Sequence, residues 1–512
     1  MTQGELEKIP QKVVKQMSAL ELRILTDIVR RIKANGFSTA SADWQITRLQ
    51  QLGKSEDDIK QWIREALQVT GDELNRICDD EVYREYYGHE RAYRMNGMNQ
   101  IPFDENQGLQ SLIEAMKRQT QETFRSLTGS MGFAIRNPAT GRLYYTPLME
   151  YYRDTLDAAM WDIHSGGFDY QTVLMRTIRE MTNSGLRWID YESGWHNRVD
   201  VAARRAIMTG FRQIQEKINE QVAAQLHTDQ YETTAHVGAR PTHQPWQGRV
   251  WMMQQLIDVC GLGTVTGLHG ANCYHDYRAF PPGSTRTYTD EQLDEMMEQE
   301  NTPKEYNGKQ YTTYEALQQQ RKMETAMRAT RQQIKLMQEG GADEQSIILK
   351  KAMYQGKMQA YKAFSEKMGL PEQMKRVYQD GLKGKFSLTK KESNVFQKQQ
   401  NYDKIKADLK EAGIKGEPIL DPEKVNIDGF GFDEKHINVE RQHQITRETA
   451  QCYINEAEIA LKRWNGQFMN YYSRSGAAYV DMKNKNVRTA FSNEEFDENV
   501  KKILEVIEKY GK

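Results

Sequence analysis

Apolar residues recur at helical spacing through the first third of this chain, and this pattern limits the possible folds more than any other feature. Intervals of four, three, four and four residues separate Val13, Met17, Leu20, Ile24 and Ile28. Because an α-helix turns once every 3.6 residues, this spacing places all five side chains on one stripe. The sequence therefore predicts an amphipathic helix that ends before Gly36.

Further helices are expected along most of the chain. One should cover Asp43–Leu52 and stop at Gly53. The next should begin at Ser55, whose hydroxyl can cap it, with the Asp58 side chain in the reciprocal position of a capping box. Short helices should then continue to about residue 125, and the helical pattern resumes between about 147 and 226. Long basic helices are predicted for about 313–383, with breaks at 340–341 and 369–371.

Composition agrees with a helical, multidomain protein. Of the 512 residues, 38% are apolar and 28% charged, which favours long amphipathic helices with large solvated faces over a thick sheet core. The chain is longer than the domains that a single hydrophobic core can stabilise. We predict a mainly α, multidomain and elongated fold with a small central α+β element and a small α+β C-terminal domain. The expected parts are a helical region (1–130), a core with His/Cys loops (131–300), a basic helical region (301–400), a linker (401–430) and the C-terminal domain (431–512).

Charge and cysteine content limit the possible partners and the cellular compartment of the protein. The net charge is −1, but residues 301–410 hold 22 Lys/Arg against 12 Asp/Glu, which suits either a solvated helical face or contact with DNA phosphates. The four cysteines lie far apart, no signal-like segment opens the chain, and no apolar run is long enough to span a membrane. A reduced cytoplasmic origin and no membrane partner are therefore expected.

Two turn-rich segments in the middle of the chain gather the residues with the most chemistry. A strand over Tyr231–Val237 should lead into a Gly/Pro loop that contains His236 and His243, and a later segment contains Cys273 and His275. The last two residues are one position apart, so in an extended segment both side chains point the same way, as in a two-ligand arm for zinc. With two histidines from His236, His243 and His269, a site of one Cys and three His ligands is possible.

Two other interpretations of these loops remain open. The histidines can simply be hydrogen-bonded residues that fix a loop. Alternatively, Gly238, Arg240 and Arg249 can bind phosphate, although no Gly-rich turn opens a helix here and no Walker lysine follows. Serine-hydrolase and zinc-protease motifs do not occur either, so the body shows no sign of conventional hydrolase chemistry.

The last 80 or so residues have a different pattern, which predicts a mixture of helices and strands. A helix is predicted for Thr446–Trp464, followed by short alternating runs at 468–473, 477–482 and 486–491 and by a final helix at 493–509. Its polar candidates for a binding or catalytic site are His436, His443, Arg447, Tyr472, Arg474, Arg488, Thr489 and Ser492.

Several motifs resemble the minor capsid proteins of tailed phages that infect Gram-positive bacteria, a family similar to the Mu F type of minor head protein. The resemblance covers roughly residues 5–400. It rests on Ala42–Gln45 (ADWQ), Leu49–Gly53 (LQQLG), Thr234–Gly248 (TAHVGARPTHQPWQG), Gly270–His275 (GANCYH) and Phe280–Gly283 (FPPG). In Mu F-type proteins the corresponding loops often carry a Cys-x-x-Cys pair and an Asn-Cys-Arg-Cys element. Arg240 and His243 stand at the first pair here, and Cys273 and His275 at the second.

The resemblance implies a structural protein of the virion. It would lie inside the capsid at the portal vertex, after assembly in the host cytoplasm, and would act in head assembly, DNA packaging or DNA delivery. The implied partners are the portal protein, the major capsid or scaffolding protein, and phage DNA.

The C-terminal segment resembles a second group, the phage-associated barnase/EndoU/colicin-like ribonucleases. The similar stretches are Glu434–Arg441 (EKHINVER), Ile445–Thr449 (ITRET), Asn470–Arg474 (NYYSR) and Arg488–Ser492 (RTAFS). This resemblance implies metal-independent RNA cleavage, with His436 or His443 as base or acid, Arg447 or Arg474 on the phosphate, and Thr489 and Ser492 as hydrogen-bond donors. The alternative function is therefore that of a toxin-tailed effector whose helical body is a carrier.

Overall fold

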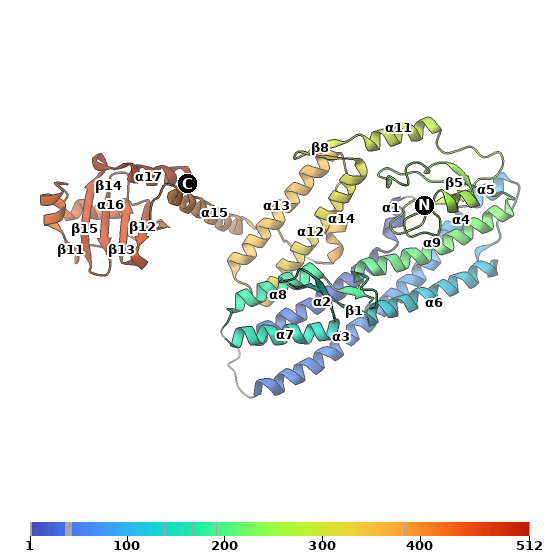
Figure 1. Ribbon diagram of the computed structural model, residues 1–512, viewed down its shortest axis with the longest axis horizontal. Helices are drawn as coiled ribbons and strands as arrows, with labels where there is room; N and C mark the ends of the chain where they lie inside the picture. Colours follow the sequence, from blue (N-terminus) through green and yellow to red (C-terminus); the bar gives the residue numbers. More distant parts are fainter. Residues whose placement is uncertain are drawn as a thin grey trace. The chain divides into compact units, whose positions relative to one another are not determined.

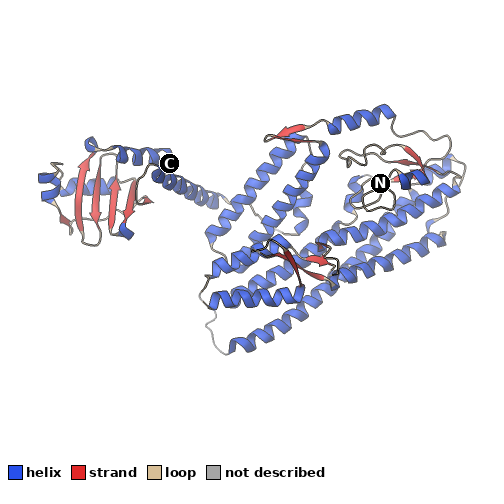
Figure 2. Cartoon of the chain, in the orientation of Figure 1, coloured by secondary structure: helices blue, strands red, loops and turns tan. Residues whose placement is uncertain are grey.

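The computed structural model describes residues 3–35, 43–137, 139–165, 167–190, 192–382 and 384–510. The chain divides into two compact units, Met1–Ser387 and Leu388–Lys512. The first unit is mostly helical, whereas the second is built on one sheet with helices packed against it (Figure 2). The prediction of a mainly α, multidomain protein is confirmed. No described helix combines the length and the apolar character that crossing a membrane requires.

The first unit contains long helices connected by small sheets (Figure 1). Its helical elements are α1 (Gln3–Lys8), α2 (Gln11–Asn35), α3 (Asp43–Arg76), η1 (Ile77–Val82), α4 (Tyr83–Tyr87), α5 (Glu90–Met95), η2 (Phe103–Glu105), α6 (Gln107–Gly129), α7 (Leu148–His164), α8 (Tyr170–Ser184), α9 (Val199–Gln225), α10 (Met253–Asp258), α11 (Asp290–Asn301), α12 (Thr313–Gly340), α13 (Glu344–Met368), α14 (Met374–Val377) and η3 (Tyr378–Asp380).

The strands of the first unit form three small antiparallel sheets with the orders β2-β1-β3-β4, β6-β5-β7 and β8-β9. Their bounds are β1 (Met131–Arg136), β2 (Leu143–Pro147), β3 (Arg187–Ile189), β4 (His196–Arg198), β5 (Gln230–Thr233), β6 (Val250–Met252), β7 (Tyr277–Ala279), β8 (Lys304–Tyr306) and β9 (Lys309–Tyr311). The strand predicted for Tyr231–Val237 exists as β5, but it ends at Thr233.

Helix α2 lies at the centre of the first unit's core. Its predicted stripe, from Val13 to Ile28, is buried, and α2 packs against α3, α7, α9 and α12, as the helical spacing required. The two basic helices α12 and α13 also occur where they were predicted. Each ends at a glycine with a left-handed backbone, Gly341 at φ +73° and Gly369 at φ +71°, so the breaks lie where the sequence placed them.

The predicted break at Gly53 is wrong. Helix α3 runs without interruption over 34 residues, so Ser55 and Asp58 lie inside it and no new helix begins there. A glycine inside a helix costs only about 1 kcal/mol relative to alanine. Burial of Ile59, Ala66 and other residues farther along α3 offsets this cost, because they continue the apolar stripe beyond the glycine. Ala42 of the ADWQ motif lies outside the described residues.

The second unit is a six-stranded sheet between two layers of helices. Its elements are α15 (Lys390–Glu411), β10 (Glu417–Leu420), β11 (Gly431–Phe432), η4 (Lys435–Glu440), α16 (Arg447–Glu456), β12 (Ile459–Arg463), η5 (Trp464–Gly466), β13 (Phe468–Tyr472), β14 (Gly476–Asp481), β15 (Asn486–Ser492), η6 (Asn493–Glu495) and α17 (Glu498–Tyr510). The strand order is β10-β12-β13-β14-β15-β11, antiparallel except for the parallel pair β15 and β11.

Two hydrophobic clusters hold this sheet. Helix α16 covers one face, where it packs on Ala460 and Ala478, and helices α15 and α17 cover the other, where they pack on Ile459 and Leu461. The three strands predicted for 468–491 are confirmed within two residues.

The sequence prediction differs from the structure at two places in this unit. The residues expected to be a linker, 401–430, instead hold the second half of α15 and strand β10. The helix predicted for Thr446–Trp464 ends at Glu456, and its second half is strand β12. Alternate residues of β12 enter the two clusters, so the strand reads as a continuous apolar run, which periodicity alone does not distinguish from a helix.

Candidate functional site

The two central loops meet beside the small sheet β6-β5-β7. Arg240 in the first loop ties them together, because its guanidinium donates to the backbone carbonyls of Thr266 (3.0 Å) and Ala271 (2.8 Å) in the second. Trp246 and Cys273 are both buried in the apolar cluster under the loops. The loops are therefore a fixed structure in which each side chain has a defined place.

Three of the predicted metal ligands converge in this structure. Nδ1 of His243 lies 3.4 Å from Nδ1 of His275, and the sulfur of Cys273 lies 3.8 Å from the first nitrogen and 3.5 Å from the second. All three residues are buried. One thiol and two imidazoles at this spacing form a donor set that suits zinc.

His236 is the neighbour of this cluster. Its ring centre lies 4.2 Å from that of His275, and its Nε2 atom is buried without a hydrogen-bond partner in the described part of the chain. A cavity of about 100 Å³ separates these residues from helix α12, and both His236 and Arg321 line it. His236 therefore borders the cluster, although it does not belong to the group of three atoms that lie within 4.8 Å of one another.

Burial sets the ionisation of these groups. It lowers the pKa of His236 and His243 and holds the pKa of His275 well below its ordinary value, so these imidazoles are neutral. Burial also raises the pKa of the Cys273 thiol, against a smaller opposing effect of Arg212. Neutral imidazoles are the form that binds metals, whereas the thiol must lose its proton to do so.

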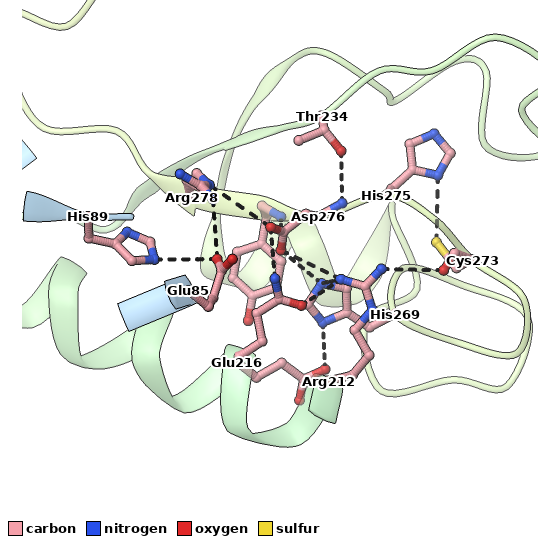
Figure 3. A network of polar contacts seen from close by, with 12 residues as sticks. Glu85, His89, Arg212, Glu216, Thr234, His269, Cys273, His275, Asp276 and Arg278 are labelled. Carbon is pink, nitrogen blue, oxygen red and sulfur yellow. Dashed lines mark hydrogen bonds and ion pairs between the residues drawn. The ribbon is translucent and has the colours of Figure 1, made fainter. Parts of the chain in front are cut away.

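His269, the other histidine considered as a ligand, lies in a polar network that reaches the backbone carbonyl of Cys273 through Arg212 (Figure 3). Its Nδ1 lies 2.9 Å from a Glu216 oxygen and its Nε2 lies 3.3 Å from Oδ1 of the fully buried Asp276. Arg212 and Arg278 pair with the same aspartate at 3.8 and 3.9 Å. The network also reaches Glu85 on α4, whose carboxylate lies 3.3 Å from Arg278. Both ring nitrogens of His269 are committed to carboxylates, so it is not a fourth ligand.

The phosphate interpretation of the loops does not fit the structure. The backbone N–H of Gly238 donates to Glu300 (2.8 Å), and Arg249 pairs with Asp290 (2.9 Å) and Asp294 (3.5 Å). Arg240 is held by the two carbonyls described above. These groups serve contacts within the protein instead of facing a shared anion site.

Sequence reasoning missed the polar residues that support the cluster. Gln247 accepts from the loop backbone and contacts His275, and the carbonyl of Thr266 lies 2.8 Å from Nε2 of His243. Asp276, at the centre of the neighbouring network, was also missed. A lone Gln or Asp in a loop carries no signal by itself, because its role depends on what the fold places around it.

The catalytic candidates of the second unit lie in separate places. Arg447 donates to the carbonyls of Ile427 and Phe430 (2.9 and 2.5 Å) at the start of α16. Arg474 pairs with Glu458 at 2.8 Å in the turn before β14. The Arg447 guanidinium therefore holds the fold, whereas the exposed Arg474 forms an ion pair at the surface.

The remaining candidates lie near β15, except Tyr472 on β13. His436 pairs with Glu440 at 3.0 Å, and His443 pairs with Glu495 at 2.6 Å while its ring lies 5.7 Å from that of Phe491. Thr489 and Ser492 pair across the sheet with Tyr479 and Gly476. Tyr472 is buried with its hydroxyl 3.3 Å from that of Tyr479, and Arg488 faces Asp433 at 3.6 Å. The structure thus brings His443 to the end of β15 that carries Ser492, with Arg474 in the turn before the strand paired to it.

Comparison with known proteins decides the family of the chain. The profile of a family described as phage minor capsid protein 2 matches residues 1–364. The chain belongs to this phage minor capsid protein family. The match includes both central loops and extends into α13, whereas the second unit lies outside it. No curated protein and no solved structure gives a significant match. This minor capsid protein is therefore a structural component of the phage head and of the virion.

Proposed function

We propose that this minor capsid protein lies inside the capsid at the portal vertex and acts in head assembly, DNA packaging or DNA delivery. The observation that carries the proposal is the family match across the helical body, residues 1–364. The resemblance of its loops to Mu F-type head proteins supports the same place in the particle. Its partners there are the portal protein and the major capsid or scaffolding protein.

Contact with packaged DNA is part of this proposal. The first unit carries exposed lysines on the basic helices and on the segment that follows them: Lys322, Lys362, Lys367 and Lys375. Lysines bind phosphates without reading sequence, and such binding weakens as counterions are added. We therefore expect weak DNA binding by the whole chain, independent of sequence, that salt abolishes.

Purified particles and a portal capture assay test the location. We expect the protein in virions at low copy by mass spectrometry, and we expect immobilised portal protein to capture the full chain. A full-length variant with Lys362→Glu and Lys367→Glu should lose DNA binding and keep portal capture. Absence from particles, or no capture of a folded chain by portal protein, would refute the portal role.

A second candidate function, metal-independent RNA cleavage, belongs to the C-terminal unit. The observation that favours it is that this unit lies beyond the family match and has its own core on both faces of one sheet. Two histidines, His436 and His443, each pair with a glutamate, and the second lies near Ser492 at the end of β15. A His–carboxylate pair can serve in proton transfer.

The test uses the full chain with RNA in magnesium-free buffer that contains a chelator. Cleavage should be lost in His443→Ala and kept in Lys435→Ala, a change at an exposed neighbouring side chain. Expression of the chain should harm host cells, and His443→Ala should remove this effect. RNA that stays intact at stoichiometric protein would exclude the nuclease.

A further inference from the structure

The three histidines around Cys273 share one arrangement. Each has one ring nitrogen against a fixed oxygen: His236 Nδ1 lies 3.1 Å from the Val237 carbonyl, and His243 Nε2 lies 2.8 Å from the Thr266 carbonyl. His275 Nε2 lies 3.0 Å from Oε1 of Gln247. A carbonyl oxygen only accepts hydrogen bonds, so the nitrogen that faces it must carry the proton.

The contacts of Gln247 show which nitrogen of His275 carries the proton. Its Oε1 also accepts from the backbone N–H of His236 at 3.2 Å, and its amide nitrogen points to the sulfur of Met296. The oxygen therefore faces two donors, and Nε2 of His275 is protonated. In the neutral form of each ring, the other nitrogen carries a bare lone pair.

This arrangement leaves acceptors facing one another in a buried place. The two bare Nδ1 atoms of His243 and His275 are 3.4 Å apart with no proton between them. The thiol of Cys273 has one proton, so it can satisfy only one of them. An unpaired buried acceptor costs about 1–3 kcal/mol, whereas a cation between the three atoms would satisfy all of them.

The spacing of the three atoms fits one particular cation. Zinc binds sulfur at about 2.3 Å and imidazole nitrogen at about 2.0–2.1 Å in a tetrahedron, which places two nitrogens about 3.3 Å apart and a nitrogen about 3.6 Å from the sulfur. The observed separations are 3.4 Å between the nitrogens and 3.5 and 3.8 Å to the sulfur. Calcium and magnesium prefer oxygen ligands, so this donor set does not suit them.

We propose that a zinc ion binds to Nδ1 of His243, Sγ of Cys273 and Nδ1 of His275, and that Nε2 of His236 completes the tetrahedron by a rotation of its side chain into the cavity beside α12. Binding releases the thiol proton of Cys273 to solvent and forms the zinc–thiolate bond. The carbonyl of Thr266 and the amide of Gln247 orient two of the rings, as outer partners of zinc histidines commonly do.

The role of this zinc is structural. Two ligands come from each loop, so the ion joins the loop after β5 to the segment before β7 at a point where Arg240 already links them. All four coordination positions are filled by protein, which leaves no site for a reacting water. The proposal concerns folding of the loops and does not depend on where the protein lies in the phage head.

Metal content and a cobalt spectrum of the full-length chain test the site. After gel filtration the protein should retain about one equivalent of zinc. Stripped protein reloaded with cobalt should show a thiolate-to-cobalt charge-transfer band and the intense visible bands of a tetrahedral ion. Cys273→Ser should lose both the charge-transfer band and most of the zinc. Cys260→Ala, which removes a buried thiol from the same cluster, should keep both.

Two further comparisons separate direct ligands from general loss of fold. His236→Ala should still bind cobalt, with a spectrum that shifts because water enters the fourth position, whereas His227→Gln, at an exposed histidine, should leave the spectrum unchanged. Gln247→Met should weaken metal binding about 10–100-fold, as loss of an outer partner does, and Gln244→Met in the same loop should not. Less than about 0.2 equivalents of zinc in the wild-type chain, without a charge-transfer band after cobalt addition, would overturn the proposal. An unchanged spectrum in His236→Ala would overturn the assignment of the fourth ligand.

Discussion

His269 and Asp276 face each other inside the first unit, with Nε2 of the histidine 3.3 Å from Oδ1 of an aspartate that has no exposed surface. Burial raises the pKa of Asp276, but the hydrogen bond from His269 and the charges of Arg212 and Arg278 outweigh it, so the net pKa lies below the ordinary value. The stabilisation from this carboxylate is therefore present above its ordinary pKa of 3.8 and is lost as the pH falls through the lower value of the folded state.

Removal of this buried charge should destabilise the first unit strongly. Asp276→Asn leaves the buried Arg212 without the carboxylate that it pairs with, a kind of change that costs about 3–5 kcal/mol. Chemical unfolding followed by circular dichroism measures the loss. Asp294→Asn, which removes an exposed partner of Arg249, serves as the control and should change stability little. Equal effects of the two changes would contradict the importance of the network.

The metal-free protein should lose stability as the pH falls below about 6.5. Burial lowers the folded-state pKa of His243 and His275 from 6.5, so below that pH the unfolded chain binds protons that the folded chain does not. Each histidine then lowers the unfolding free energy by up to about 1.4 kcal/mol per pH unit until its folded pKa is reached. Urea unfolding with a chelator, compared at about pH 7.5 and about pH 5.5, measures this loss.

Two variants provide the controls for that experiment. His243→Gln should weaken the pH dependence, because it removes one of the buried histidines, and His227→Gln at an exposed position should not. A His243→Gln variant with the wild-type pH dependence would show that the buried ring does not cause it.

Gly476 at the start of β14 should tolerate no side chain. A β-carbon there would lie 2.3 Å from the nearest ring atom of Tyr453 on α16, and such overpacking costs about 1–3 kcal/mol. We expect Gly476→Ala to speed hydrogen exchange in α16 and β14, measured by mass spectrometry on the full chain. Gly429→Ala, where a β-carbon meets no atom within 4 Å, is the matched control. Unchanged exchange in Gly476→Ala would mean that Tyr453 does not pack as described.

Two glycines of the basic helices should respond in opposite directions. Gly356 lies in the interior of α13 with open space around it, so Gly356→Ala should stabilise the first unit by about 0.5–1 kcal/mol. Gly341 ends α12 at φ +73°, where an L side chain is strained, so Gly341→Ala should destabilise it by about 1 kcal/mol. Chemical unfolding of the two variants measures both changes, and the same sign for both would contradict the assigned backbone.

Most of the correct predictions of the fold came from apolar residues at helical spacing and from glycines at the ends of helices. The stripe from Val13 to Ile28 predicted α2, and Gly341 and Gly369 marked the ends of α12 and α13, because local geometry decides these features. The prediction that Gly53 ends a helix was wrong, since contacts made farther along α3 override the weak tendency of one glycine to interrupt a helix. The sequence predicts helix for strand β12 because helices cover both faces of its sheet, a fact that only the tertiary structure contains.

The sequence predicts which residue types form the site, but it does not predict which residues they contact. His243, Cys273 and His275 stood out because few residues combine a thiol or an imidazole with turn-rich surroundings. That His269 joins Asp276 instead depends on α9, which supplies Arg212 and Glu216 from a distant part of the chain. The sequence suggests that Arg240 replaces a metal ligand or contacts a phosphate, whereas its guanidinium donates to two backbone carbonyls.

The two outer strands of the C-terminal sheet bear on aggregation. Pro418 removes a backbone donor from β10, and β11 is only two residues long. An incoming strand from another molecule therefore finds few free donors and acceptors with which to extend the sheet. The unit is thereby protected against edge-to-edge polymerisation at the high local protein concentrations in which a phage head assembles.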